Sequence, residues 1–381
     1  MKWEKVKLGD IATFSNGINF NKTAYAKGIK LIGVSNFGDR FYPDYSQLQE
    51  VKKDIVRLED YLRNGDIVFV RSNGNKELVG RCMLVKNLTE RVTYSGFCIR
   101  ARLDDTDRYD PVYFTYYFKS KAFRRAVSGT AVGANIQNLS QARLSNHDCN
   151  VPDIETQHRI ADILSAYDDL IENNQKQIKL LEEAAQRLYK EWFVDLRFPG
   201  YENTKIVGGV PEGWRRRLLK ELISVNYGKD HKKAPDDGNI PVYGSGGLMR
   251  KCNKSLFSGE AVLIPRKGSL NNIMYVDETF WTVDTMFYAT MKQPHTAVFV
   301  YFFVKAFDMY SMNIGAAVPS MTTKILDAMD VVIPDKETLE KFDKLTKTYF
   351  NKIKTLQGQN ERLKTARDLL LPKLMSGEVE V

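Results

Sequence analysis

Two loops of this chain combine arginine, lysine and asparagine in a way that suits the reading of nucleic-acid bases. One is RSNGNKELVGR at residues 71–81, directly after an apolar strand-like run, and the other is PRKGSLNN at residues 265–272. Their candidate DNA-binding residues are Arg71, Asn73, Asn75, Lys76, Arg266 and Lys267. Arginine and lysine can bond guanine edges, and asparagine can bond adenine through both ends of its amide. We predict DNA contacts here; the alternative is a pair of ordinary solvated hairpins.

Glycine-flanked loops supply a second group of candidates. They are YGKDHKK at 227–233, YGSGGLMRKCNK at 243–254 and GTAVGANIQNLS at 129–140, the last with an image, GAAVPSMTTKIL, at 315–326. Their candidate DNA-binding residues are Lys229, His231, Lys232, Arg250, Lys254, Asn135 and Gln137. Glycine allows the backbone to approach a ligand closely, and cations release counterions from phosphates. These loops therefore extend the predicted DNA-binding surface.

Sequence signatures of catalysis are missing. There is no GxxxxGK[ST] phosphate loop, no GxGxxG after a strand, and no HExxH or GxSxG motif. The four cysteines and four histidines do not cluster, so neither a disulfide framework nor a zinc site is indicated. We expect a non-catalytic chain with no catalytic residue, cofactor or metal of its own. An enzyme with an unrecognised site is one alternative.

The candidate loops belong to stretches that end in a repeated joint. VPDIETQHRIADIL at 151–164 returns as VIPDKETLEKFDKL at 332–345. In each copy a proline closes an extended segment, and an aspartate, Asp153 or Asp335, is placed to cap the helix that follows. A later glutamate falls in the first turn, where the positive end of the helix dipole favours it. Both joints therefore predict a strand that leads directly into a helix.

Each joint opens a long heptad seam of apolar residues, which is typical of paired helices. The helix-pairing residues of the first seam are Ile160, Leu164, Tyr167, Ile171, Asn174, Ile178, Leu181 and Leu188. Those of the second seam are Phe342, Tyr349, Ile353, Leu356, Asn360, Leu363 and Leu370. If the helices pack antiparallel, Asn174 meets Asn360, and such a polar pair fixes register at a cost in stability. The alternative is that both asparagines face solvent.

The stretches before the helices are also duplicated. The matching segments are WEKVKLGDIATFSNG at 3–17 with WRRRLLKELISVNYG at 214–228, NGDIVFV at 64–70 with SGEAVLI at 258–264, and PVYFTYYFKS at 111–120 with AVFVYFFVKA at 297–306. Strand-like and helical runs mix without regular alternation, so the predicted class is α+β. The predicted domains are a globular domain at 1–153, a helical spacer at 154–196, a second globular domain at 197–335 with a linker at 195–213, and a C-terminal helical spacer at 336–381.

Composition agrees with a DNA-binding role. The chain has 381 residues and a net charge of +9, and the excess of lysine and arginine lies mostly in the two globular stretches. A basic surface favours a polyanionic partner. No apolar run approaches the roughly 20 residues that span a bilayer, and the N-terminus lacks the apolar region of a signal peptide. We expect a cytoplasmic protein.

Four segments together resemble one known family, the specificity subunits of type I restriction-modification systems. They are LYKEWFVDLRFPGYE at 188–202, LLLPKLMSGEVEV at 369–381, NLSQARLSNHDCNVPDIETQHRIADIL at 138–164, and the second joint. The second joint differs from the first by having Leu339 where the first has Gln157. The resemblance extends along nearly the whole chain.

This resemblance implies a fold and a function. It implies two tandem target recognition domains, each reading half of a bipartite sequence in double-stranded DNA, with an antiparallel coiled coil that sets their separation. It also implies two methyltransferase subunits docked on the helices and two restriction, or motor-nuclease, subunits. S-adenosylmethionine, ATP and Mg would then serve those partners. The main alternative is a stand-alone DNA-binding scaffold or regulator without methyltransferase partners.

Overall fold

The computed structural model describes residues 3–38, 40–75, 77–127, 138–312 and 320–381. Its contacts divide the chain into two compact units. Unit 1 comprises Met1–Asn174 and Gly358–Val381, and unit 2 comprises Gln175–Gln357. Each unit therefore contains a globular domain and part of each of the two long helices. Because this division cuts both helices, the predicted domain boundaries stay predictions.

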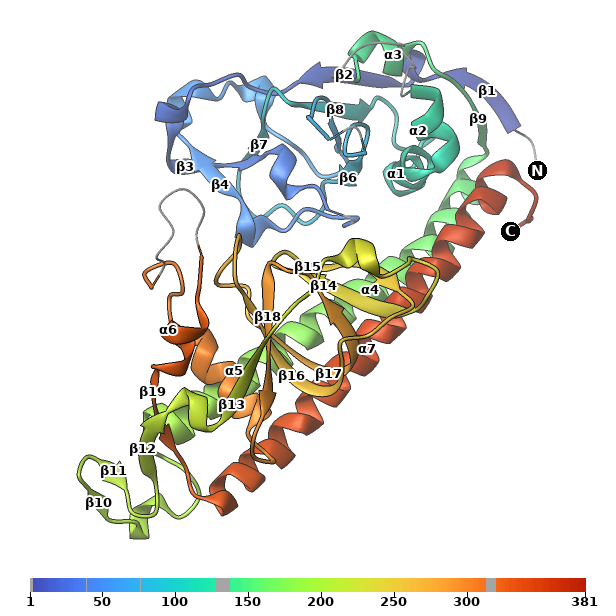
Figure 1. Cartoon of the computed structure of the whole chain (residues 1–381). Coiled ribbons are helices and arrows are strands. Elements are labelled where there is room, and N and C mark those ends of the chain that lie inside the picture. The colour runs from blue at the N-terminus through green and yellow to red at the C-terminus, as the bar shows by residue number, and fades with distance from the viewer. Residues whose placement is uncertain (1–2, 39, 76, 128–137, 313–319) are drawn as a thin grey trace. The chain divides into compact units, whose positions relative to one another are not determined.

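Unit 1 is a mixture of small sheets and short helices (Figure 1). Its strands are β1 (Trp3–Lys7), β2 (Ala12–Asn16), β3 (Tyr25–Ile32), β4 (Gln49–Val51), β5 (Ile67–Val70), β6 (Cys82–Leu84), β7 (Val92–Tyr94), β8 (Cys98–Leu103) and β9 (Asp148–Pro152). Its short helices are α1 (Pro111–Lys119), α2 (Lys121–Val127) and α3 (Gln141–Ser145). The strands form sheets ordered β2-β8-β5-β6, β4-β3-β7 and β1-β9.

Strand β5 explains why two cores lie back to back in unit 1. All four of its residues are buried, and side chains alternate between the faces of a strand. Ile67 and Phe69 pack into the core shared with α1 and the long helices, and Val68 and Val70 pack into the core shared with β7. A strand covered on both faces needs a continuous apolar run, as IVFV supplies.

Unit 2 repeats this plan with a larger sheet. Its strands are β10 (Ile206–Val207), β11 (Val210–Pro211), β12 (Arg215–Leu218), β13 (Ile223–Tyr227), β14 (Ile240–Gly244), β15 (Gly247–Cys252), β16 (Phe257–Pro265), β17 (Met274–Thr282), β18 (Met286–Met291) and β19 (Asp330–Ile333). Its short helices are α5 (Ala297–Lys305) and α6 (Thr323–Asp327). The main sheet has the order β13-β18-β16-β17-β14-β15, and β12 pairs with β19. The predicted linker contains the small β10–β11 hairpin.

The duplication is confirmed by strand pairing, with one correction. Ile67 lies opposite Ala101, which lies opposite Phe14, and Val262 lies opposite Ala289, which lies opposite Val225. Phe14 and Val225 hold equivalent places in the matched opening segments, so the equivalent of Ile67 is Val262. The motif match had aligned Ile67 with Ala261 and was wrong by one residue. Such a slip exchanges the two faces of a strand, and only the pairing of neighbouring strands resolves it.

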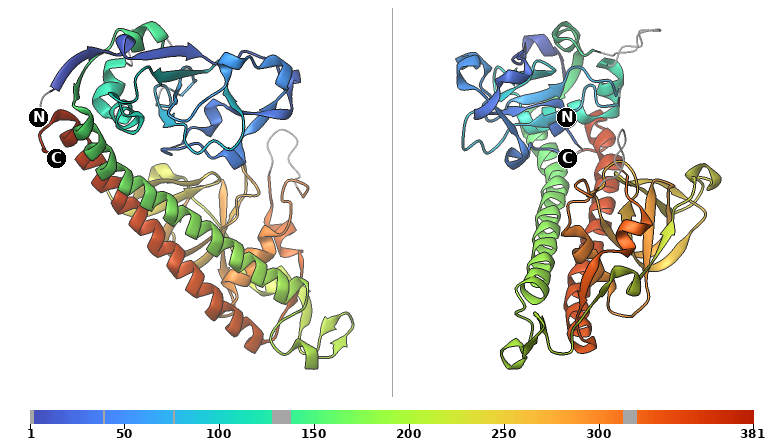
Figure 2. Two further views of the ribbon diagram at one scale, coloured as in Figure 1. Left: turned by 180° about the vertical axis from the view of Figure 1, so that it is seen from behind. Right: turned by 60° about the vertical axis from the view of Figure 1, so that its left-hand side comes forward.

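Two long helices, α4 (Ile154–Tyr189) and α7 (Lys336–Ser376), extend through both units. A single π-helical turn, Lys190–Val194, continues α4. The helices lie side by side and antiparallel, green and red in Figure 2. Both predicted caps are confirmed: Asp153 accepts a hydrogen bond from the Thr156 N–H, and Asp335 accepts one from the Thr338 N–H, each at 2.9 Å.

Burial of the seam residues agrees with the heptad pattern. All fifteen predicted helix-pairing residues are buried or half-buried. Within unit 1, the Asn174 Nδ2 donates to Asn360 Oδ1 at 2.9 Å, and the two side chains are 7% and 6% exposed. The alternative in which both asparagines face solvent is therefore wrong. No helix among the described residues is long and apolar enough to cross a membrane.

Candidate nucleic-acid interface

Arg71 is fixed by a tight backbone turn directly after β5. Its N–H donates to the Phe97 carbonyl at 2.8 Å, and its own carbonyl accepts from the Leu139 N–H at 2.9 Å. Its guanidinium donates to the Gly96 carbonyl at 3.0 Å. The turn between β7 and β8 therefore accepts hydrogen bonds from both the backbone N–H and the guanidinium of this arginine. One guanidinium N–H is used there, and the fork has five, so donors are left for a ligand.

Arg266 makes the same set of contacts in unit 2, directly after β16. Its N–H donates to the Thr285 carbonyl at 2.8 Å, and its carbonyl accepts from the Met321 N–H at 2.9 Å. Its guanidinium donates to the Asp284 carbonyl at 3.3 Å. The β17–β18 turn thus plays the part that the β7–β8 turn plays in unit 1. The two arginines occupy equivalent sites, each framed by three chain segments.

A glycine in each unit makes this framing possible. A β-carbon added at Gly17 would lie 2.2 Å from the Tyr94 carbonyl oxygen, and one added at Gly228 would lie 2.0 Å from that of Val283. Any side chain would therefore push β2 or β13 away from the turn that carries the arginine's partners. The N–H groups of these glycines also donate to equivalent carbonyls, of Cys98 and Met286. The matched glycines at the ends of SNG and NYG are thus explained by close packing.

The surroundings of the two arginines differ. In unit 1 the neighbouring Phe97 side chain is 64% exposed. In unit 2 the Arg266 guanidinium lies over the ring of Tyr227, 5.5 Å from its centroid, and Tyr227 is itself 53% exposed. Such a cation–π contact orients the guanidinium plane. Sequence reasoning singled out neither aromatic residue, because no spacing rule separates an exposed aromatic residue from a buried one.

The predicted asparagines of the first loop shape its backbone. Asn73 Oδ1 accepts from the Asn75 N–H at 2.7 Å, and Asn75 Oδ1 accepts from the Glu77 N–H at 3.0 Å. Both are Asx-type turns, which use the carbonyl end of the amide and leave the NH₂ end for other partners. The remaining candidates of the first domain, Lys76, Asn135 and Gln137, lie outside the described residues.

The predicted cations of unit 2 divide into two groups. Arg250 is half-buried and its Nη2 donates to the carbonyls of His231 and Ala234, while the Lys254 Nζ lies 3.5 Å from the Lys233 carbonyl. These two side chains therefore contact the backbone of one turn. Lys254 is nevertheless exposed, as are Lys229, Lys232 and Lys267, and His231 is half-buried. Exposed lysine side chains of this kind are available for contact with phosphates.

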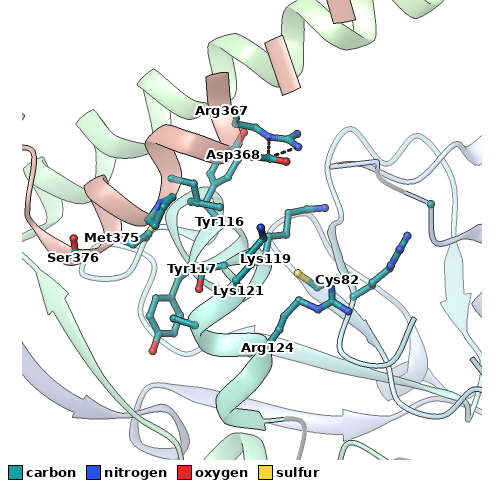
Figure 3. A pocket seen from close by; sticks show the side chains of 16 residues that line it. Cys82, Tyr116, Tyr117, Lys119, Lys121, Arg124, Arg367, Asp368, Met375 and Ser376 are labelled. Atoms are coloured by element: carbon teal, nitrogen blue, oxygen red, sulfur yellow. Dashed lines mark hydrogen bonds and ion pairs between the residues drawn. The ribbon is translucent and has the colours of Figure 1, made fainter. Parts of the chain in front are cut away.

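A buried polar triad, missed by sequence reasoning, joins the unit 1 domain to its helices. The Tyr116 hydroxyl of α1 donates to Asp168 Oδ2 of α4 at 2.6 Å, and Arg367 of α7 forms an ion pair with Asp168 Oδ1. Burial and the charge of Asp168 raise the pKa of Tyr116, so its hydroxyl stays protonated and able to donate. Figure 3 shows Arg367 and Tyr116 close together at the edge of a cavity of about 360 Å³.

Unit 2 has a different polar network at its own junction. His295 Nδ1 lies 2.7 Å from Asp343 Oδ2, and the Lys347 Nζ bridges Asp343 at 3.1 Å and Glu260 at 3.2 Å. By the matched helices, Tyr116 and Asp168 of unit 1 correspond to Phe302 and Phe350, whose rings lie 6.3 Å apart. The two domains therefore contact their helices through chemically distinct networks.

The two joints also differ chemically. In the first, the Gln157 amide donates to the carbonyls of Arg108 and Pro152 and accepts from the Asp110 N–H. In the second, Leu339 is buried in the apolar core of unit 2. At this one position, the first joint is therefore held by hydrogen bonds and the second by apolar packing.

The cysteine thiols lie inside the molecule. All four cysteines are free and buried. Burial raises the pKa of Cys82 to about 11 and that of Cys98 and Cys149 to about 12, so these three thiols stay protonated near neutral pH. Within the described residues, no group of three or more His, Cys, Asp or Glu side chains is arranged to hold a metal ion.

Comparison with known proteins accounts for this duplicated architecture. The family model described as type I restriction modification DNA specificity domain matches residues 1–183 and again residues 211–365. The chain belongs to this family. Its two type I DNA specificity domains coincide with the two copies of the arginine turn, since one match contains Arg71 and the other contains Arg266.

Individual members of the family resemble the chain along most of its length. The MjaIX specificity subunit of a type I restriction enzyme from Methanocaldococcus jannaschii is 26% identical over 312 residues, 71% of this chain and 69% of that protein. The HindI specificity subunit from Haemophilus influenzae is 23% identical and covers 99% of both chains. The crystal structure of a type I S subunit from M. genitalium covers 98% of this chain and 96% of its own, with 18% identity and a TM-score of 0.59, and so shares its fold.

Proposed function

We propose that this protein is the DNA-binding specificity subunit of a type I restriction-modification complex, and that each domain reads one half of a bipartite target. The observation that carries the proposal is the duplicated arginine turn. Arg71 and Arg266 follow equivalent strands, and each keeps guanidinium donors beyond the one that its turn uses. Two equivalent donors on two domains suit a target with two halves.

Linking two DNA-binding domains in one chain raises the affinity for the complete target. Once one domain is bound, contact by the second is intramolecular, so two weak half-sites can make one tight site. The paired helices α4 and α7 belong to both units, which supports a role in setting the spacing between half-sites.

We further propose the partners that would complete the complex. Two methyltransferase subunits would dock on the helices, and two restriction subunits would complete the endonuclease. S-adenosylmethionine would serve the methyltransferases, and ATP and Mg the motor-nuclease subunits, so this chain would contribute recognition only. The protonated thiols and the absence of a phosphate loop from the sequence support a chain without chemistry of its own. The complex would act in the cytoplasm.

The test is the pattern of adenine methylation in the host genome, mapped with the gene, without it, and with the gene restored. We expect a split, two-part motif that disappears on deletion and returns on restoration. A pattern that stays unchanged would contradict the proposal. Co-purification of the tagged chain with a methyltransferase separates this function from that of a stand-alone DNA-binding regulator, which would purify alone.

A further inference from the structure

The Phe97 side chain is a large apolar group displayed to solvent on the β7–β8 turn. It is 64% exposed, whereas the residues on either side of the turn, Tyr94 and Cys98, are fully buried. An exposed aromatic residue next to a candidate DNA-contacting arginine is informative, because exposed apolar surface of this kind gains free energy when a partner covers it.

The backbone that carries Phe97 is held rigidly. The Phe97 carbonyl accepts from the N–H groups of Arg71 at 2.8 Å and Ser72 at 3.4 Å, and the Phe97 N–H donates to Ser95 Oγ at 3.2 Å. The preceding Gly96 donates its N–H to the Ile18 carbonyl at 2.7 Å. The side chain is therefore presented from a fixed turn, and ordering it on binding costs little backbone entropy.

The surface beside Phe97 is aromatic and carries amide groups. A cavity of about 340 Å³ is lined in part by Phe97, Phe20 and Tyr25. The Phe20 and Tyr25 rings meet edge to face with centroids 5.3 Å apart, and Tyr25 is 45% exposed. The Arg71 guanidinium is bonded to the carbonyl of Gly96, the residue directly before Phe97. A flat apolar group and a cation are thus offered from one turn, which matches a base face next to a phosphate.

The equivalent turn of unit 2 lacks this aromatic residue. Thr285 is the counterpart of Phe97, because its carbonyl accepts from the Arg266 N–H as the Phe97 carbonyl accepts from that of Arg71. The arginine is shared by the two domains and the phenylalanine is not. Phe97 is therefore a feature of the first domain alone, and its effect should be confined to one half of the target.

We propose that Phe97 inserts between neighbouring base pairs of the half-site read by the first domain and opens that base step. The inference rests on the proposed function. Apolar side chains inserted in this way unstack a step and bend the duplex, and contacts between bases and aromatic rings contribute substantially to affinity. Opening a step favours flexible pyrimidine–purine sequences, so Phe97 contributes to specificity without hydrogen-bonding a base.

The experiment uses the full chain in complex with its methyltransferase partners and a duplex that carries the mapped motif. 2-Aminopurine replaces single bases across both half-sites, apart from the methylated adenine, because flipping of that base would also raise fluorescence. We expect the wild-type complex to raise fluorescence at one step of one half-site. Phe97→Ala and Phe97→Thr should abolish that signal and weaken binding about tenfold, and Phe97→Trp should retain both.

A matched control removes another exposed apolar side chain of unit 1. Leu58 is 82% exposed and does not line the cavity beside Phe97, so Leu58→Ala should leave both signals unchanged. The proposal is overturned if Phe97→Ala and Phe97→Thr bind with unchanged affinity, or if the fluorescence signal persists in them. Failure of the proposed function is distinguishable, because the wild-type complex would then not select the motif duplex over a scrambled one.

Discussion

Arg71 and Arg266 are bound to their turns by the same backbone contacts, while the side chains around them differ. The two halves of a target usually differ in sequence. A contact that both domains make therefore does not by itself distinguish one half-site sequence from the other. We infer that the two arginines bind phosphates and position each domain, because phosphate contacts fix register without reading sequence. Discrimination between base sequences then depends on residues that differ between the two domains, among them Phe97 and Tyr227.

This division of roles predicts the effect of removing either arginine. Arg71→Ala or Arg266→Ala should weaken DNA binding and lower the slope of log affinity against log salt by about 1, leaving the methylated motif unchanged. Arg57→Ala is the control, since Arg57 is also an arginine of unit 1 and its side chain is 78% exposed. Relaxed specificity at one base position would instead identify a base-reading arginine.

The triad of Tyr116, Asp168 and Arg367 predicts a large stability effect. Arg367→Met leaves a buried carboxylate without its cation, and we expect a loss of about 3 kcal/mol in the free energy of unfolding, measured with denaturant. Changing all three to Phe, Leu and Met should restore most of the loss, because unit 2 is apolar at equivalent positions. Arg187→Met, at a surface pair with Glu183, should cost under about 1 kcal/mol. Equal losses in both arginine variants would contradict this account.

The pairing of α4 with α7 combines apolar residues, which stabilise the pair, with one polar contact, which fixes its register. Leucine, isoleucine and aromatic residues fill most of the seam, and apolar seams tolerate sliding by a heptad. The Asn174–Asn360 hydrogen bond satisfies two buried amides in one alignment only. It lies next to the division between the units, where α7 also contains Gly358, a poor helix former.

Replacing both asparagines by leucine tests this role. We expect the double variant to unfold at a higher temperature but to populate more than one register, because the polar constraint is gone. Either single variant should be less stable than the wild type, since one amide stays buried without a partner at a cost of about 1–3 kcal/mol. Spin labels at Ala166→Cys and Ala366→Cys report register, because the native cysteines are all buried. A double variant with one distance and lower stability would refute the prediction.

At the scale of the whole molecule, one chain contains two equivalent domains and two helices that belong to both units. The domains differ where they contact their helices, through the Asp168 triad in unit 1 and the Asp343 network in unit 2. Each domain is therefore matched to its own helix segments. One globular domain of such a chain can be exchanged for another only if its contacts with the helices are preserved.

We predict that lengthening both helices lengthens the unread spacer between the two halves of the target. One heptad inserted after Asn174 and one after Gln357, at the division between the units, keeps the seam in phase and adds roughly 10 Å. The mapped motif should gain about three unread base pairs, at 3.4 Å each. An insertion in α4 alone is the control and should disrupt pairing, because the two seams no longer match in length. Methylation at the original sites by the doubly lengthened chain would contradict the prediction.

We predict that exchanging the first domain changes only one half of the methylated motif. Residues 1–153 from another family member, with Tyr116 preserved as the partner of Asp168, should alter one half of the methylated sequence and leave the other intact. The reason is that the unit 2 domain keeps all of its own contacts. Mapping the methylated motif of the exchanged chain is the measurement, and a change in both halves together would show that the domains do not read independently.

Most of the architecture followed from the sequence because it depends on local chemistry. Heptad spacing predicted both helices and, if they pack antiparallel, the meeting of Asn174 with Asn360; proline and aspartate at the joints predicted where each helix begins. These signals depend on residues a few positions apart, which the backbone geometry of a helix or turn brings together. The repeated motifs predicted the duplication for the same reason.

Tertiary structure decided what depends on residues far apart in the chain. The pairing of β5 and β16 with their neighbours corrected the alignment by one residue, because a shift of one leaves a strand apolar but reverses its faces. The equivalence of Arg71 and Arg266, the Asp168 triad and the exposure of Phe97 each arise from three or more segments that meet only in the folded chain. Sequence spacing carries no record of such meetings, so the residue types of the DNA-binding loops were predictable and their neighbours were not.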